Sequence, residues 1–220
     1  MSYLLRVVVP DQPGMLGAVA TALGRAGGDI VSVDIVERGR GTAVDDLVVD
    51  LPPGRLPDGL VTAARSVAGV TVESIRPYVG GPLDTHRELE VIEAMAERPD
   101  EAMHSLVTAL PRIFRAGWAV VVRRTDSGCR VGAGSSAAPV LDGVSLPWLP
   151  LAKAHVLDPE DEWVPASWQH LGTELAAAPL GEPERAVLLG RPGGPAFRAG
   201  ELMRLAHLTG VAATIVTNTA

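Results

Sequence analysis

The fold of this chain is decided by residues 3–30, which have the sequence YLLRVVVPDQPGMLGAVATALGRAGGDI. Residues 3–9 are an apolar run that predicts a strand, and the tetrapeptide Asp-Gln-Pro-Gly at 11–14 predicts a sharp polar turn. A helix is predicted from residue 15 to residue 26, and the glycine pair at 27–28 ends it. Because the first N–H groups of a helix lack acceptors within it, this loop can hold an anion.

The sequence up to residue 80 continues as alternating short strands and one more helix. The helix at 15–26 is expected to turn one apolar face to the core, formed by Leu16, Val19, Ala20 and Leu23. The elements that follow are strands at 29–37 and 42–51, a helix at 56–68 and a strand at 70–79. The order βαββαβ predicts a ferredoxin-like unit, with strand 3–9 at its centre and strand 29–37 at an edge.

Residues 3–79 resemble the ACT domain, a regulatory module for small ligands. The resemblance rests on the βαββαβ order, on Asp-Gln-Pro-Gly-Met-Leu-Gly at 11–17 in the first loop, and on Gly-Asp-Ile at 28–30, which opens the second strand. Ligands of this family are mostly amino acids, and they usually lie at a dimer interface between the first loop and the start of the second strand. The resemblance therefore implies an amino-acid ligand and a homodimer formed through this domain.

The ligand-binding residues that the resemblance implies lie in two short segments. They are Asp11, Gln12, Pro13, Gly14, Met15 and Leu16 in the first loop, and Asp29 and Ile30 in the second strand. Our hypothesis for their roles is that the backbone N–H groups at 14–16 bind a carboxylate. Asp11 or Asp29 would then accept charge-assisted hydrogen bonds from an ammonium group. Such a site suits a small zwitterion, and the strand 29–37 is the edge through which we expect two copies to pair.

The pattern of the first half stops at the Gly-Gly-Pro sequence at 80–82, which predicts a domain boundary. We expect an ACT-like domain at 1–80, a linker at 81–83 and a second domain at 84–220. Helices are predicted at 84–97, from 99–101 onward with an end or kink at Pro111, and at 199–215. Strands are predicted at 118–124, 129–134, 173–180 and 185–191, with an irregular segment at 135–170. This pattern indicates an α+β domain with a mainly antiparallel sheet.

The second half is similar to a compact GAF domain, a sensor module. The resemblance rests on the end of the chain, where ELAAAPL at 174–180 and AVLLGR at 186–191 are followed by PAFRAGEL at 195–202 and a closing helix. It implies a GAF-like α+β fold that passes a signal to a protein partner.

Composition excludes several classes of partner. The formal net charge is −7 with no evident basic face, which argues against a nucleic-acid partner. The longest apolar stretches are far shorter than the roughly 18 residues of a membrane helix, so no membrane partner is expected. The N-terminus lacks the pattern of a signal peptide, and the single Cys129 fits a reducing compartment. These features predict a cytoplasmic protein.

Other polar and aromatic groups give no catalytic pattern. Asp45, Asp46 and Asp50 are interpreted as a solvated face or a turn, since acidic residues are mostly exposed. The five histidines lack the short spacing of a metal site, and no nucleophile–base arrangement is evident. Three tryptophans lie in the irregular segment, where they could form its core or line a pocket: Trp148, Trp163 and Trp168.

The sequence therefore predicts a regulatory protein that uses no cofactor or metal and is not an enzyme. Its ACT-like domain would bind an amino acid and act allosterically, because a ligand shifts an equilibrium only through different affinities for two states. One alternative is a dimerisation or interaction module that has lost its ligands. The other is an enzyme that uses a pocket in the second domain.

Overall fold

The computed structural model describes residues 1–78, 87–141 and 143–218, and the chain divides into two compact units, Met1–Asp84 and Thr85–Ala220. The predicted linker at 81–83 lies outside the described residues. None of the helices in the described ranges combines the length and the apolar character needed to cross a membrane.

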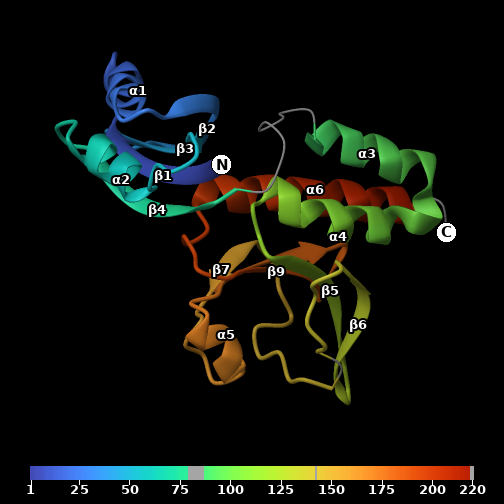
Figure 1. Cartoon of the computed structure of the whole chain (residues 1–220). Helices are drawn as coiled ribbons and strands as arrows, with labels where there is room; N and C mark the ends of the chain where they lie inside the picture. Colours follow the sequence, from blue (N-terminus) through green and yellow to red (C-terminus); the bar gives the residue numbers. More distant parts are fainter. Residues whose placement is uncertain (79–86, 142, 219–220) are drawn as a thin grey trace. The chain divides into compact units, whose positions relative to one another are not determined.

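The first unit has the predicted βαββαβ order. Its elements are β1 (Ser2–Pro10), α1 (Met15–Arg25), β2 (Asp29–Gly39), β3 (Thr42–Asp50), α2 (Asp58–Arg65) and β4 (Thr71–Pro77). The four-stranded antiparallel sheet has the order β2-β3-β1-β4, which confirms that β1 is central and that β2 is an edge strand. Helices α1 and α2 cover the same face of this sheet (Figure 1).

Alternating side chains of the central strands build the core of the first unit with the two helices. Leu5 and Val7 of β1 pack with Leu47 of β3 against Val19 and Leu23 of α1. The expectation that Leu16 joins this face is wrong, since Leu16 lies in the first turn of α1 and is 37% exposed.

The end of α1 depends on a glycine for steric reasons. Gly27 has a left-handed φ of 87°, and the Gly28 N–H donates to the carbonyl of Leu23, as in a common helix C-terminus. A Cβ atom at Gly28 would lie 2.7 Å from Val49 Cγ1 and 2.9 Å from Leu60 Cδ2. Only glycine therefore allows the chain to pass this closely over the core and enter β2.

The second unit is an α+β structure with one five-stranded antiparallel sheet of order β6-β5-β9-β8-β7. Its helices are α3 (Arg87–Glu97), the short 3-10 helix η1 (Pro99–Glu101), α4 (Ala102–Ile113), α5 (Ala166–His170) and α6 (Ala199–Thr217). Its strands are β5 (Trp118–Thr125), β6 (Gly128–Gly134), β7 (His155–Leu157), β8 (Glu174–Leu180) and β9 (Glu182–Arg191). The predicted α+β class with antiparallel sheets is confirmed.

The two faces of this sheet are covered differently (Figure 1). Helices α4 and α6 pack on one face, and the segment 135–170 with α5 covers the other. The expectation that 135–170 is irregular throughout is wrong, because it contains β7 and α5. β7 has only three residues and forms by pairing with β8. The sequence therefore contains no local pattern that predicts it. Pro111 lies inside α4, which continues to Ile113.

A buried ion pair joins three parts of the second unit. Arg191, at the end of β9, donates to Glu201 of α6, to the carbonyl of Phe114 and, at 2.8 Å, to the carbonyl of Pro195. Glu201 also accepts a 2.9 Å hydrogen bond from the Arg198 N–H, which caps the start of α6. Arg191 and Glu201 are 0% and 3% exposed, so this pair fixes the start of the closing helix within the core.

Candidate functional site

The predicted binding loop is a tight turn between β1 and α1, and a backbone hydrogen bond joins it to the turn between β2 and β3. Gly14 adopts a left-handed φ of 88°, which residues other than glycine rarely tolerate. The Gln12 N–H donates to the carbonyl of Pro10 at 2.9 Å, and the Asp11 N–H donates to the carbonyl of Gly41 at the same distance. The Met15 N–H donates to the carbonyl of Gln12 at 3.3 Å, so one of the three predicted carboxylate donors is engaged inside the turn.

The Asp11 carboxylate is held by an arginine of the edge strand. Arg38 Nε lies 2.9 Å from both Asp11 Oδ1 and Asp11 Oδ2, and Arg38 Nη2 lies 2.8 Å from Oδ1. The hydrogen bond from Arg38 lowers the pKa of Asp11, and the same contact raises the pKa of Arg38. Asp11 is thus ionised but already has a cationic partner, which the sequence analysis missed.

The second predicted segment lies at the other end of the sheet. Asp29 pairs in register with Asp50, which pairs with Ser2 at the start of β1, whereas the first loop follows Pro10, opposite Thr42. At about 3.3 Å per residue, the two ends of β3 are roughly 25 Å apart. Within one chain, the structure therefore does not bring Asp29 and Ile30 together with residues 11–16.

A residue that was not predicted as part of the site, Asp45, lies in β3 two positions from Ala43, which pairs with Val9 and Arg38 next to the loop. Asp45 is only 3% exposed and Asp46 is 0% exposed, so the interpretation of these acids as a solvated face is wrong. Asp46 receives hydrogen bonds from Arg6 Nε at 2.7 Å and from Arg6 Nη2 at 2.8 Å. Asp45 points to the opposite face, and its Oδ1 atom has no hydrogen-bond partner among the described residues. The signal in the sequence was two acids within an apolar strand.

The electrostatic surroundings of Asp45 disfavour its charged form. Burial raises the pKa of the Asp45 carboxyl, and the charges of Asp46, Asp11 and Asp34 raise it further, while Arg38 lowers it. A buried acid that is unpartnered and surrounded by other acids is a candidate functional group.

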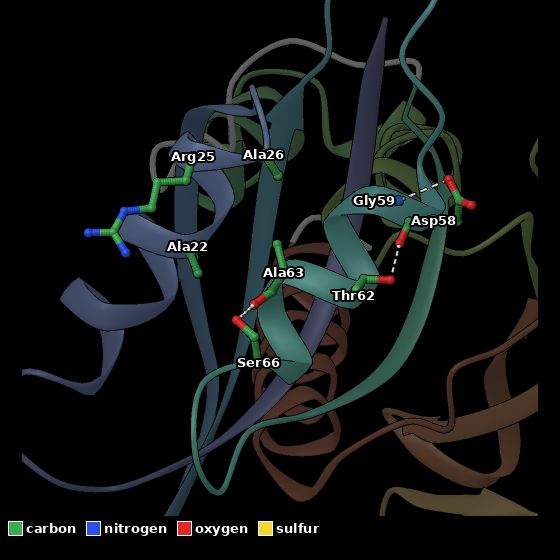
Figure 2. Close-up of a pocket in the computed structure, with 8 residues that line it drawn as sticks. All are labelled: Ala22, Arg25, Ala26, Asp58, Gly59, Thr62, Ala63 and Ser66. Carbon is green, nitrogen blue, oxygen red and sulfur yellow. Dashed lines mark hydrogen bonds between the residues drawn. The ribbon is translucent and has the colours of Figure 1, made fainter.

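A groove of about 480 Å³ lies between α1 and α2, and it contains none of the predicted site residues (Figure 2). Its lining consists of Ala22, Arg25, Ala26, Asp58, Gly59, Thr62, Ala63 and Ser66. The Thr62 hydroxyl donates to the Asp58 carbonyl at 3.1 Å, and the Ser66 hydroxyl donates to the Ala63 carbonyl at 2.6 Å. Because these hydroxyl protons are used within α2, Arg25 is the remaining side-chain donor in the lining of the groove.

In the second unit, the tryptophans lie in the core between the sheet and the segment 135–170. Trp168 packs against Trp118 with 4.8 Å between ring centroids, and Trp163 lies 5.9 Å from Trp148 and 6.4 Å from Trp168. Leucines and valines fill the space around them, which favours the interpretation of these rings as core. Nowhere in the described ranges do three His, Cys, Asp or Glu side chains gather as a metal site would require.

Comparison with known proteins now decides the family of the first unit, since residues 3–69 match the family model of the ACT domain. These residues form an ACT domain. ACT domains are ligand-binding regulatory domains. The chain is also 22% identical over 145 residues to the NAD-dependent malic enzyme of Geobacillus stearothermophilus, a match that covers 58% of this chain. The chain spans about 30% of the length of that enzyme.

Solved structures similar to the rest of the chain include GAF domains. One is the GAF domain of a phosphoenolpyruvate-protein phosphotransferase from Coxiella burnetii, with a TM-score of 0.46 and 12% identity over 62% of this chain and 96% of that chain. Another is the nlh2 GAF domain of A. aeolicus, with a TM-score of 0.43 and 10% identity over 61% of this chain and 98% of that chain. GAF domains are sensor domains.

Proposed function

We propose that this chain is a regulatory protein whose ACT domain binds an amino acid between two copies of itself and catalyses no reaction. The observation that carries the proposal is the position of the two predicted binding segments at opposite ends of one sheet. Antiparallel pairing of two β2 strands around a two-fold axis sets the start of each strand beside the end of the other. It would therefore place Asp29 and Ile30 of the partner subunit beside the first loop, near Arg38. The two-fold axis would generate two such complete sites in each dimer.

The outer edge of β2 has no partner strand in the part of the chain that the structure describes, and this edge supports such pairing. Val31, Val33 and Ile35 are 42%, 40% and 56% exposed on this strand. Exposed apolar side chains on an unpaired edge favour association with another strand. Val33 and Ile35 pair in register with Leu47 and Asp45, so they belong to the face that carries the helices and the loop. A second copy would cover these side chains and the open backbone groups of the edge together.

The loop suits the carboxylate of an amino acid. The start of α1 presents backbone N–H groups at the positive end of the helix dipole, and the left-handed Gly14 directs the chain into this helix. A ligand held between two copies stabilises the dimer to the extent that it binds the dimer more tightly than the separate subunits. We propose that the second unit passes this change to a protein partner in the cytoplasm.

Thermal unfolding and calorimetry with each of the twenty amino acids test the ligand class. A ligand at a hundred times its dissociation constant stabilises the native state by about 2.7 kcal/mol, which raises the melting temperature by several degrees. We expect one amino acid or a small chemical group of them to give this shift. No response to any amino acid at millimolar concentration would contradict the proposal.

Replacement of Val33 by Lys tests the dimer, because Val33 is 40% exposed and pairs in register with Leu47 rather than with an acid. A monomer tolerates the change because the position is exposed. A charge at the centre of the edge opposes the pairing of two β2 strands. We therefore expect the mass measured by sedimentation to fall from that of a dimer to that of a monomer. Amino-acid binding should weaken with it, because half of the site comes from the second copy. Leu56→Lys is the control, since Leu56 is 71% exposed and lies outside β2. A monomeric wild-type protein that binds amino acids at full affinity would overturn this arrangement.

A second candidate function is a dimerisation module without a ligand. The contact between Asp11 and Arg38 favours it, because this acid is already partnered. The amino-acid panel separates the two functions, since this module would form the same dimer but show no thermal shift.

A further inference from the structure

Among the described residues, the Oδ1 atom of Asp45 has no hydrogen-bond partner, and the sheet register places this residue near the first loop. In the sheet register, Asp45 lies between Val7 of β1 and Ile35 of β2, on the face that carries α1 and α2. The next row of this face, toward the first loop, pairs Ala43 with Arg38. Arg38 in turn holds Asp11 at the start of the loop. Asp45 is therefore separated by a single cross-strand pair from Arg38, which holds Asp11, and lies on the helix-covered face of the sheet.

The charges around Asp45 favour a bound cation. Asp11, Asp34 and Asp46 act on Asp45 with negative charge, and Arg38 is the positive group among them. The Arg38 guanidinium directs its hydrogen bonds to Asp11, and Asp46 is held by Arg6. The partners in the chain thus leave Asp45 with an unused acceptor in a negative, mostly apolar environment.

The nature of this cation follows from the neighbouring groups. In the ranges that the structure describes, no cluster of three metal-ligating side chains is present, so the geometry offers a metal ion too few ligands. An ammonium group needs only one or two carboxylate acceptors, and such charge-assisted hydrogen bonds are strong in a buried site. The N–H groups at the start of α1 would hold the carboxylate of the same molecule.

We propose that Asp45 accepts the ammonium group of the amino acid and makes the ACT domain specific for α-amino acids over α-hydroxy acids. This inference rests on the proposed function. The role was predicted above for Asp11 or Asp29. Asp11 is bound to Arg38, and the partner's Asp29 would be a second acceptor beside Asp45. A hydroxyl in place of the ammonium group would leave the buried carboxylate without its counter-charge, and sites with buried polar groups discriminate strongly against ligands that fail to satisfy them.

The test compares wild-type protein with Asp45→Asn by calorimetry. The probes are the amino acid that binds most tightly among the twenty and the α-hydroxy acid with the same side chain. For the wild type, we expect the hydroxy acid to bind at least about tenfold more weakly. For Asp45→Asn, the amino acid should lose about tenfold or more in affinity while the hydroxy acid changes little, so that the preference disappears. Asp100→Asn, which removes an exposed carboxylate of the second unit, should keep the preference.

The outcomes separate this inference from the proposed function. If the wild type binds an amino acid and Asp45→Asn keeps its preference over the hydroxy acid, the role of Asp45 is wrong and the proposed function stands. If the wild type binds no amino acid, both fall. Binding of the hydroxy acid by Asp45→Asn also reports that the variant is folded. Equal affinities of the wild type for the two acids would overturn the inference without any variant.

Discussion

Two buried carboxylates, Glu201 of the second unit and Asp45 of the ACT domain, have very different surroundings. In the second unit, Arg191 has three acceptors from different elements, and Glu201 accepts from Arg191 and from the backbone at Arg198. In the ACT domain, Asp45 is equally buried, yet its Oδ1 atom has no partner among the described residues. The first arrangement holds a scaffold together, whereas the second leaves an acceptor available at a cost in stability.

The same contrast occurs between neighbouring residues of β3. Asp46 is held by two hydrogen bonds from Arg6 across the sheet, while Asp45 points to the other face without such a partner. Sequence neighbours of the same type can thus have different roles, because alternate residues of a strand face different surroundings. Three predictions follow from this contrast, in order of the size of their effects.

The largest effect is expected when the buried pair of the second unit is broken. Arg191→Met removes the guanidinium that neutralises the buried Glu201 carboxylate, which should lower the free energy of unfolding by about 3–5 kcal/mol. Urea denaturation followed by tryptophan fluorescence measures this unit alone, because all four tryptophans lie within it. A loss below about 1 kcal/mol would show that this pair does not hold the scaffold.

Replacement of Asp45 is expected to change the free energy of unfolding in the opposite direction. In the absence of a ligand at pH 7, Asp45→Asn should stabilise the ACT domain by about 1 kcal/mol, since it removes a buried charge that lacks a partner. Native-state amide exchange of β1 and β3 measures this difference. If Asp45→Asn destabilises the domain, the carboxylate has a partner that supports the fold, and the contrast between the two carboxylates is wrong.

The dependence on pH gives a second reading of the same variant. The pKa of Asp45 is raised in the folded state, so its contribution to stability is most favourable at low pH. This contribution is lost as the pH rises from the ordinary pKa of an aspartate, about 4, through the raised value. The advantage of Asp45→Asn should therefore grow over this range.

The smallest effect is expected at an exposed pair of the second unit. Arg98 and Glu101 are 2.7 Å apart, and their side chains are 61% and 52% exposed. Arg98→Gln should change the free energy of unfolding by less than about 0.5 kcal/mol, because water and salt screen surface pairs. The tryptophan-monitored urea titration used for Arg191→Met provides the measurement. A larger loss of unfolding free energy would show that burial does not explain the difference between this pair and the Arg191–Glu201 pair.

Much of the ACT fold could be predicted because its signals are local. The turn at 11–14 and the glycine pair at 27–28 are local signals for the first elements. The order βαββαβ predicted that strand 29–37 lies at an edge, and the structure confirms both the order and the edge strand. The strand β7 could not be predicted, because three residues carry no pattern and the strand exists through its pairing with β8.

The candidate site was predictable only in part. The sharp turn at 11–14 was predicted from its residue types, and the structure shows such a turn, with a left-handed Gly14 at the start of α1. The pairing of Asp11 with Arg38 joins residues that are 27 positions apart, and no local pattern in the sequence indicates it. The separation of Asp29 from this loop follows from the order and direction of the strands.

The sequence by itself determined the order of elements, the sharp turn before α1 and the end of that helix, since local backbone preferences and apolar periodicity set them. Only the tertiary structure decided which acids are buried, which of them have partners and which ends of the strands meet. The physical reason is that sheet register and burial arise from contacts between distant residues. These contacts make Asp46 part of the scaffold and leave the Asp45 Oδ1 atom without a hydrogen-bond partner among the described residues.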